Sequence, residues 1–175
     1  MMKPTTTTAA ATTTPAVWIG SLHAYNCGSL VGEWTQATDL DQLRKVAARV
    51  LRRGGGEEIA LMDFENFGEM IGEYTQLERV AQIAAAIEEH GEALVLYASH
   101  AGFDAVDDVD DFVERFESAY VGAGFESLKD YAEDRFHELF EVPDALAPYI
   151  DYGAFENTLD CEGTWFAEGH VFMPA

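Results

Sequence analysis

The sequence of 175 residues has little cysteine, few basic residues and no long apolar run. Cys27 and Cys161 are too few for a disulfide framework and lack the paired spacing of a zinc site, so we expect two reduced thiols. Because no run is long enough for a membrane span or a signal peptide, the expected location is the cytoplasm. The 48% hydrophobic and 12% aromatic content nevertheless predicts a folded core.

The shortage of Lys and Arg is confined to one part of the chain. Residues 1–53 contain six Lys/Arg and three Asp/Glu, which gives a local charge of +3. Residues 54–175 contain four Lys/Arg and 29 Asp/Glu, which gives a local charge of −25. Self-repulsion on this scale opposes folding, and solubility alone does not require it. Salt adaptation of a whole proteome would not leave the first part slightly basic. The natural partners should therefore be basic, and direct binding to nucleic acid or to an anionic membrane is disfavoured.

The pattern of strands and helices predicts an α+β fold of three small domains in tandem. Residues 1–15, rich in Thr and Ala, are expected to form a disordered leader. In the N-terminal domain, 16–66, Asp39 can cap a helix that Gly54-Gly55-Gly56 stops. The expected elements of this domain are strands at Val17 to Leu22, Leu30 to Gln36 and Ile59 to Phe64, with a helix at Leu40 to Leu51.

A helical middle domain is expected at residues 67–103. Thr75 and Glu78 have the spacing of a capping box, and Gly91 is suited to end the helix that follows. The apolar run Ala93 to His100 does not distinguish a helix from a strand by its periodicity, and its helical neighbours favour a helix. The stripe that defines the first helix consists of Leu77, Val80, Ala81, Ala84 and Ile87.

The third domain, 104–175, is expected to be an acidic α+β domain with two amphipathic helices. Asp107 or Asp108 suits the N-cap of the first helix, and Ser127 with Asp130 has the spacing of a capping box for the second. A helical turn through Tyr149 and a final hairpin near Glu168-Gly169, between strands at Thr164 to Phe166 and His170 to Met173, complete the domain. The two apolar stripes are Val109, Phe112, Val113, Phe116 and Tyr120, then Leu128, Tyr131, Ala132, Phe136, Leu139 and Phe140.

Like-charge pairs one helical turn apart accumulate on these two helices. Each of the pairs Asp107 with Asp111, Asp110 with Glu114, Asp130 with Asp134 and Asp134 with Glu138 disfavours the helix by roughly 0.2–0.5 kcal/mol. One charged face is an ordinary solvated face, but the whole pattern favours an acidic surface that stands in for the phosphates of DNA. The residues predicted for this surface are Asp63, Glu65, Glu69, Glu73, Glu88, Glu89, Asp107, Asp108, Asp110, Asp111, Glu114, Glu117, Glu126, Asp130, Glu133, Asp134, Glu138 and Glu141.

Motifs for catalysis and for cofactors are missing. Asp104 to Glu114 does not match an EF-hand loop, His137-Glu138 lacks the second His of a zinc protease, and the triple glycine lacks the Lys of a phosphate loop. We therefore expect no enzyme, no metal and no cofactor. A hydrolase with two working carboxylates stays open only because acidic pairs are so numerous.

Several segments resemble, in the same order, those of the ArdA antirestriction proteins, across roughly residues 17 to 175. They are Tyr25-Asn26-Cys27-Gly28-Ser29-Leu30-Val31-Gly32-Glu33-Trp34, Glu58-Ile59-Ala60-Leu61-Met62-Asp63-Phe64-Glu65, Gly72-Glu73-Tyr74-Thr75, and Val142-Pro143 leading into Tyr149-Ile150-Asp151-Tyr152. The resemblance implies an elongated protein that dimerises through its C-terminal domain and mimics bent B-DNA. Its implied partner is a type I restriction-modification enzyme, whose DNA-binding groove it would occupy.

The resemblance places the antirestriction motif of the family at about Leu128 to Glu141. Phe136, Leu139 and Phe140 could then serve the dimer or the monomer core, and we favour the core for most of them. The chain departs from the family in its Thr-rich leader and in a basic first helix, which is either a solvated face or pairs with the chain's own acids within the dimer. A general acidic binder of basic DNA-binding proteins is the alternative function. The basic residues of that helix are Arg44, Lys45, Arg49, Arg52 and Arg53.

Overall fold

The structure is a computed structural model that describes residues 14–104, 108–143 and 145–174. The contacts within the chain divide it into two compact units, and the boundary in the sequence lies between Phe112 and Val113. The described residues form seven α-helices and two three-stranded antiparallel sheets, so the expected α+β class is confirmed. The division into three domains stays a prediction, and the expected leader and Asp107 lie wholly or largely outside the described residues.

The sheet of the first unit has the order β2-β1-β3, with β1 at Ala16–Ser21, β2 at Gly32–Gln36 and β3 at Ile59–Glu65. All pairs are antiparallel, and a register shift between Trp18 and Ile19 marks a bulge against β3. The three strands confirm the expected ones to within two residues at each end. A short helix that the sequence did not indicate, α1 at Leu22–Asn26, follows β1 directly, with the Ser21 side chain as its N-cap.

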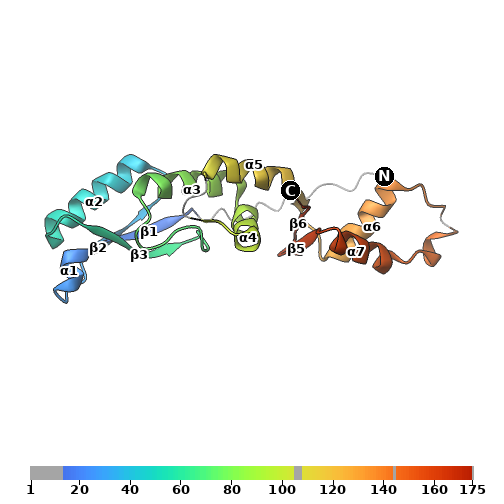
Figure 1. The fold of residues 1–175 in the computed structure, drawn as a ribbon, viewed down its shortest axis with the longest axis horizontal. Helices are drawn as coiled ribbons and strands as arrows, with labels where there is room; N and C mark the ends of the chain where they lie inside the picture. The colour runs from blue at the N-terminus through green and yellow to red at the C-terminus, as the bar shows by residue number, and fades with distance from the viewer. Residues whose placement is uncertain (1–13, 105–107, 144, 175) are drawn as a thin grey trace. The chain divides into compact units, whose positions relative to one another are not determined.

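Helix α2, Leu40–Gly54, covers one face of this sheet and contacts all three strands (Figure 1). The side chain of Asp39 accepts a hydrogen bond from the Gln42 backbone, which confirms the expected cap. Gly55, at φ 74°, provides the C-cap in a backbone conformation that favours glycine. Val46 and Val50 of the helix and Val17 and Ile19 of β1 are fully buried, so the core of the unit lies between the helix and the sheet.

Three further helices belong wholly or partly to the first unit: α3 at Leu77–His90, α4 at Glu92–Ala101 and the start of α5 at Val109–Ala119. Gly91 separates α3 from α4, which confirms both the expected stop and the helical assignment of the apolar run. Phe112 packs against Tyr97 and Phe103, with ring centroids 5.5 and 4.7 Å apart. These rings attach the first turn of α5 to α4.

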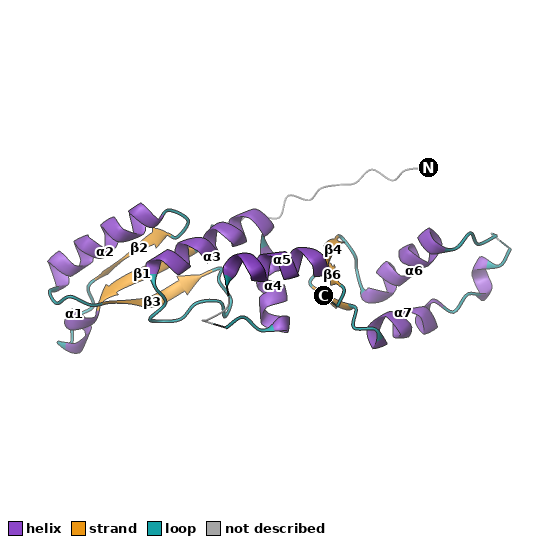
Figure 2. Cartoon of the chain, turned by 45° about the horizontal axis from the view of Figure 1, so that its top comes forward, coloured by secondary structure: helices purple, strands orange, loops and turns teal. Residues whose placement is uncertain are grey.

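The second unit contains the rest of α5, β4 at Tyr120–Ala123, α6 at Leu128–Leu139, a 3-10 turn at Ala147–Tyr149, α7 at Tyr152–Cys161, β5 at Trp165–Ala167 and β6 at His170–Phe172. Its sheet has the order β4-β6-β5. Phe172 stacks on Trp165 with centroids 4.0 Å apart and also contacts Phe116 and Tyr120. Helices α6 and α7 pack against each other in this unit (Figure 2).

Several expectations for these helices were wrong. Thr75 does not cap α3, because its hydroxyl accepts a hydrogen bond from the Gly72 backbone; α3 begins after Gln76, whose side chain makes no cap bond. Tyr120 starts β4 instead of continuing α5. Leu139 and Phe140 are each 50% exposed, so they do not belong to the monomer core, and Phe136 is half-buried. Strand β4 and helix α7 were not expected at all.

The expected capping of the two acidic helices is confirmed in part. Asp108, the second of the two residues proposed for α5, accepts hydrogen bonds from the backbones of Asp110 and Asp111. Ser127 caps α6 by accepting from the Asp130 backbone. The Asp130 carboxylate reaches back to the Glu126 backbone, one residue before the position that a capping box requires.

Candidate acidic surface

The predicted acidic residues lie at the surface of their units. Of the 18 residues, Asp107 is outside the described part, Asp130 and Glu133 are half-buried, and the other 15 are exposed. Within the first unit, β3 carries Asp63 and Glu65, and α3 carries Glu88 and Glu89 in its last turn. None of the described Asp and Glu residues belongs to the buried core. The folded units therefore present their carboxylates to solvent.

Helix α5 holds the densest group of these carboxylates. Over its 11 residues, about 16.5 Å at 1.5 Å per residue, α5 has four acidic residues and Arg115, a net charge of −3. This is one charge per about 5.5 Å, compared with one phosphate per about 3.4 Å along one strand of B-DNA. At about 100° per residue, Asp110, Glu114 and Glu117 lie within about 60° of one another, on the side opposite the buried Phe112 and Phe116.

Helix α6 is less dense in charge. Its 12 residues, about 18 Å long, carry four acidic residues with Lys129 and Arg135, so its net charge is −2. Arg135 also pairs with Glu138, with nitrogen and oxygen 3.0 Å apart. Of the two acidic helices that the sequence indicated, α5 therefore has the charge per length that is closer to that of a DNA strand.

Some of the acidic residues occupy positions that weaken their own helices. Glu88 and Glu89 lie in the last turn of α3, and Glu117 in the last turn of α5, where the negative end of the helix dipole disfavours a carboxylate by about 0.3–1 kcal/mol each. Asp110 and Asp111 lie in the first turn of α5, where the same dipole favours them. Only part of the negative charge can therefore be explained by helix stability.

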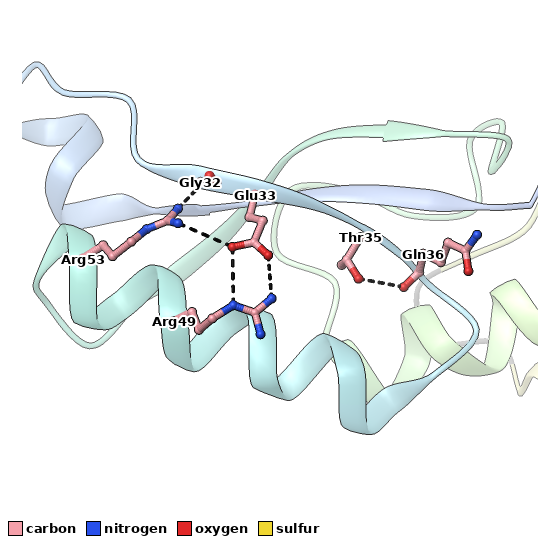
Figure 3. A network of polar contacts seen from close by, with 6 residues as sticks. All are labelled: Gly32, Glu33, Thr35, Gln36, Arg49 and Arg53. Carbon is pink, nitrogen blue, oxygen red and sulfur yellow. Dashed lines mark hydrogen bonds and ion pairs between the residues drawn. The ribbon is translucent and has the colours of Figure 1, made fainter.

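The basic residues of α2 are engaged largely within the first unit. Arg49 donates two hydrogen bonds to the Glu33 carboxylate of β2, at 2.5 and 3.5 Å, and Arg53 pairs with the same carboxylate while donating to the Gly32 carbonyl (Figure 3). These contacts hold α2 against the edge strand β2. The hydrogen bond from Arg49 lowers the pKa of Glu33 below its ordinary value of 4.5.

Arg44 of the same helix reaches α3, where its guanidinium lies 2.7 Å from the Glu78 carboxylate. This hydrogen bond lowers the pKa of Glu78. Arg44, Arg49 and Arg53 therefore pair with acidic residues of the chain itself, and they do so within one copy of the chain, whereas the expected pairing was within the dimer. Lys45 and Arg52 are exposed and form a solvated face.

Other acidic residues are exposed as well, although the sequence pattern did not single them out. The exposed residues outside the predicted set include Glu57, Glu58, Glu92, Asp104, Asp151, Asp160, Glu162 and Glu168. They lie in loops, at helix starts or in α7, where no long amphipathic stripe marks an outward face. Only the general excess of acidic residues could have indicated them.

The described residues contain no group of three His, Cys, Asp or Glu side chains placed to hold a metal ion. Across the same part of the chain, no helix combines the length and apolar character that crossing a bilayer requires. Cys27 and Cys161 form no disulfide, and both side chains are exposed.

Comparison with known protein families gives a match over nearly the whole described chain. The sequence model of a family described as antirestriction protein (ArdA) matches residues 17–172, and thus includes every described helix and strand except the first residue of β1. No curated protein matches the chain.

Proposed function

Because this chain belongs to the ArdA family of antirestriction proteins, we propose that it acts as a protein mimic of DNA. In this proposal its acidic surface occupies the DNA-binding groove of a type I restriction-modification enzyme and excludes DNA from it. The chain needs no catalytic activity of its own for this role, because occupancy alone blocks the enzyme. The basic groove of the target provides the complementary charge.

The observation that carries this proposal is the charge density of α5. Its net charge of −3 over about 16.5 Å is more than half the charge per length of one DNA strand, and it lies on a helix whose opposite side is anchored by Phe112 and Phe116. Because the helix itself is anchored, only the acidic side chains and not the backbone have to be ordered on binding. The net charge of −22 also accelerates the encounter with a basic groove, and this effect weakens as salt screens it.

We further propose that the chain acts as a homodimer through its C-terminal unit. Leu139 and Phe140 at the end of α6 are each 50% exposed, Leu146 is 55% exposed, and Tyr149 is 85% exposed. Helix α7 contributes no fully buried residue to its own unit. A second copy of this region could cover these apolar side chains, since such clusters mark protein contacts.

The direct test is competition between the purified chain and a DNA duplex for a type I restriction-modification enzyme. We expect the chain to displace the duplex, with an inhibition constant that rises steeply between 0.05 and about 0.5 M salt. Displacement that does not change with salt, or no displacement, would contradict the proposal. Equal displacement from a panel of unrelated basic DNA-binding proteins would favour the alternative, a general acidic binder.

A further inference from the structure

A groove of about 430 Å³ lies in the first unit, where it borders β3. Because the sheet order is β2-β1-β3, this strand is at the edge of its sheet. Five of the six lining residues are aliphatic or aromatic, and the sixth is a glutamate. The lining residues are Tyr25, Leu30, Leu61, Met62, Phe64 and Glu73.

Two of the apolar side chains in this groove are more exposed than packed. Tyr25 is 59% exposed and Leu30 is 71% exposed. Both lie in the connection between β1 and β2, Tyr25 within α1 and Leu30 after it. They contribute little to the core of the unit. Exposed aromatic and aliphatic side chains grouped around a groove are typical of a contact surface.

The carboxylate of the groove belongs to a firmly held segment. The Glu73 carbonyl accepts a hydrogen bond of 2.9 Å from the Leu61 backbone on β3, and Gly72 and Thr75 on either side are tied by two further hydrogen bonds. The hydroxyl of Tyr74, which is 71% exposed, donates to the Glu73 carboxylate, and this contact raises the pKa of Tyr74. Glu58 lies close enough to contribute to the same shift. The lining contains no Lys or Arg.

We propose that this groove binds an arginine side chain of the partner protein, with the aliphatic stem against Leu30 and Met62 and the guanidinium at Glu73. Arginine suits the site because its planar group can stack on an aromatic ring such as Tyr25 and donate two parallel hydrogen bonds to one carboxylate. A lysine ammonium is more strongly hydrated and cannot do both. The surrounding negative charge complements a basic polypeptide and repels an acidic one.

This inference rests on the proposed function for the identity of the partner, and it adds a contact that DNA cannot make. A phosphate backbone offers charge but no apolar groove for the stem of a basic side chain. Burial of apolar surface is screened far less by salt than ion pairing is. The groove would therefore retain part of the affinity at salt concentrations where the purely ionic contacts of the acidic surface have faded.

The test uses the whole chain with its methionine methyl groups labelled with ¹³C, and nuclear magnetic resonance to follow them. Met62 lies in the groove, whereas the buried Met70 and the exposed Met173 serve as internal references. The probe is a blocked tripeptide with a central arginine, and its counterpart contains citrulline, which has the same shape but no charge. We expect a saturable shift of the Met62 signal with the arginine peptide and a much weaker one with the citrulline peptide.

Two variants and one matched control locate the binding. Glu73→Gln should weaken binding of the arginine peptide about tenfold, as the loss of one charge-assisted hydrogen bond predicts. Leu30→Ser should weaken it about threefold. Glu69→Gln, an exposed residue outside the lining, changes the net charge equally and should have little effect.

An equal loss of affinity for the arginine peptide in Glu69→Gln and Glu73→Gln would contradict arginine binding in the groove. A shift of the Met62 signal no larger than that of Met173 would also contradict it. Neither outcome depends on a restriction enzyme, so the failure of the groove is separate from the failure of the proposed function. A chain that does not displace DNA but shows the Met62 response would refute mimicry and keep the arginine site.

Discussion

The charge density of α5 leads to a quantitative prediction about inhibition. The perturbation is a fourfold neutralisation of the acidic residues within the helix, which keeps Asp108 as the N-cap and leaves the buried Phe112 and Phe116 untouched. Screened surface ion pairs contribute about 0.2–1 kcal/mol each. Four of them amount to about 0.8–4 kcal/mol, or about four- to 900-fold in the inhibition constant. The changes are Asp110→Asn, Asp111→Asn, Glu114→Gln and Glu117→Gln.

The assay is displacement of a fluorescent duplex from a type I restriction-modification enzyme at about 0.1 M salt. Each single change should weaken displacement by no more than about fivefold, because the affinity is spread over many charges. A matched control with the same net charge neutralises four exposed acidic residues outside the predicted surface. These control changes are Glu57→Gln, Asp160→Asn, Glu162→Gln and Glu168→Gln.

The control separates the local density of charge from the total charge. We expect the α5 variant to lose several times more affinity than the control variant, while circular dichroism shows that both keep their helices. Equal losses would mean that net charge alone governs binding, as for a general acidic binder. An α5 variant that displaces DNA as well as the unchanged chain would refute the proposal that this helix imitates a DNA strand.

Three predictions concern stability. Because the hydrogen bond from Arg49 lowers the folded pKa of Glu33 below 4.5, the ionised pair stabilises the fold above that pH, and the benefit is lost as the pH falls through the lowered value. Urea unfolding should therefore show Glu33→Gln to be less stable than the unchanged chain at pH 7, with a gap that closes below about pH 4.5, whereas a pH-independent gap would contradict this reasoning. Phe116→Ala removes a ring that is 2% exposed and should cost about 3–5 kcal/mol in the same assay; a cost under 1 kcal/mol would mean that the aromatic cluster is loosely packed. Gly32→Ala places a methyl group 2.2 Å from an indole carbon and should cost about 1–3 kcal/mol, whereas Gly72→Ala, which meets no atom within 4 Å, should be nearly neutral.

Local signals in the sequence were sufficient for most of the fold. Asp39, Ser127 and Gly91 mark helix boundaries through their own side chain or backbone, so their effect does not depend on distant residues. Thr75 gave a false signal because a threonine hydroxyl can also bond to the backbone of a nearby turn, and here it does so with Gly72. Helix α7 was missed because it has no strong apolar stripe, although Asp151 before its first residue accepts a cap hydrogen bond from the Ala154 backbone.

The candidate surface was predictable as a set of residues but not in its arrangement. Alternation of acidic and apolar residues is enough to place Asp110 or Glu114 outside, because the opposite face must be buried. Sequence alone could not show that Arg49 and Arg53 share Glu33 across 16 to 20 positions of the chain, which removes much of the apparent basic patch. The groove at Glu73 depends on a loop that is hydrogen-bonded to β3, and no sequence motif indicates this contact.

The placement of carboxylates along the helices separates stability from binding. In the first turn of α5, Asp110 and Asp111 favour the helix through its dipole, so their presence is explained equally well by folding and by mimicry. Glu88 and Glu89 at the end of α3 oppose their helix through its dipole, so helix stability does not account for them. A protein under selection only for stability would carry Lys or Arg at that end. The basic partner proposed for this chain would account for the two acidic residues at the end of α3.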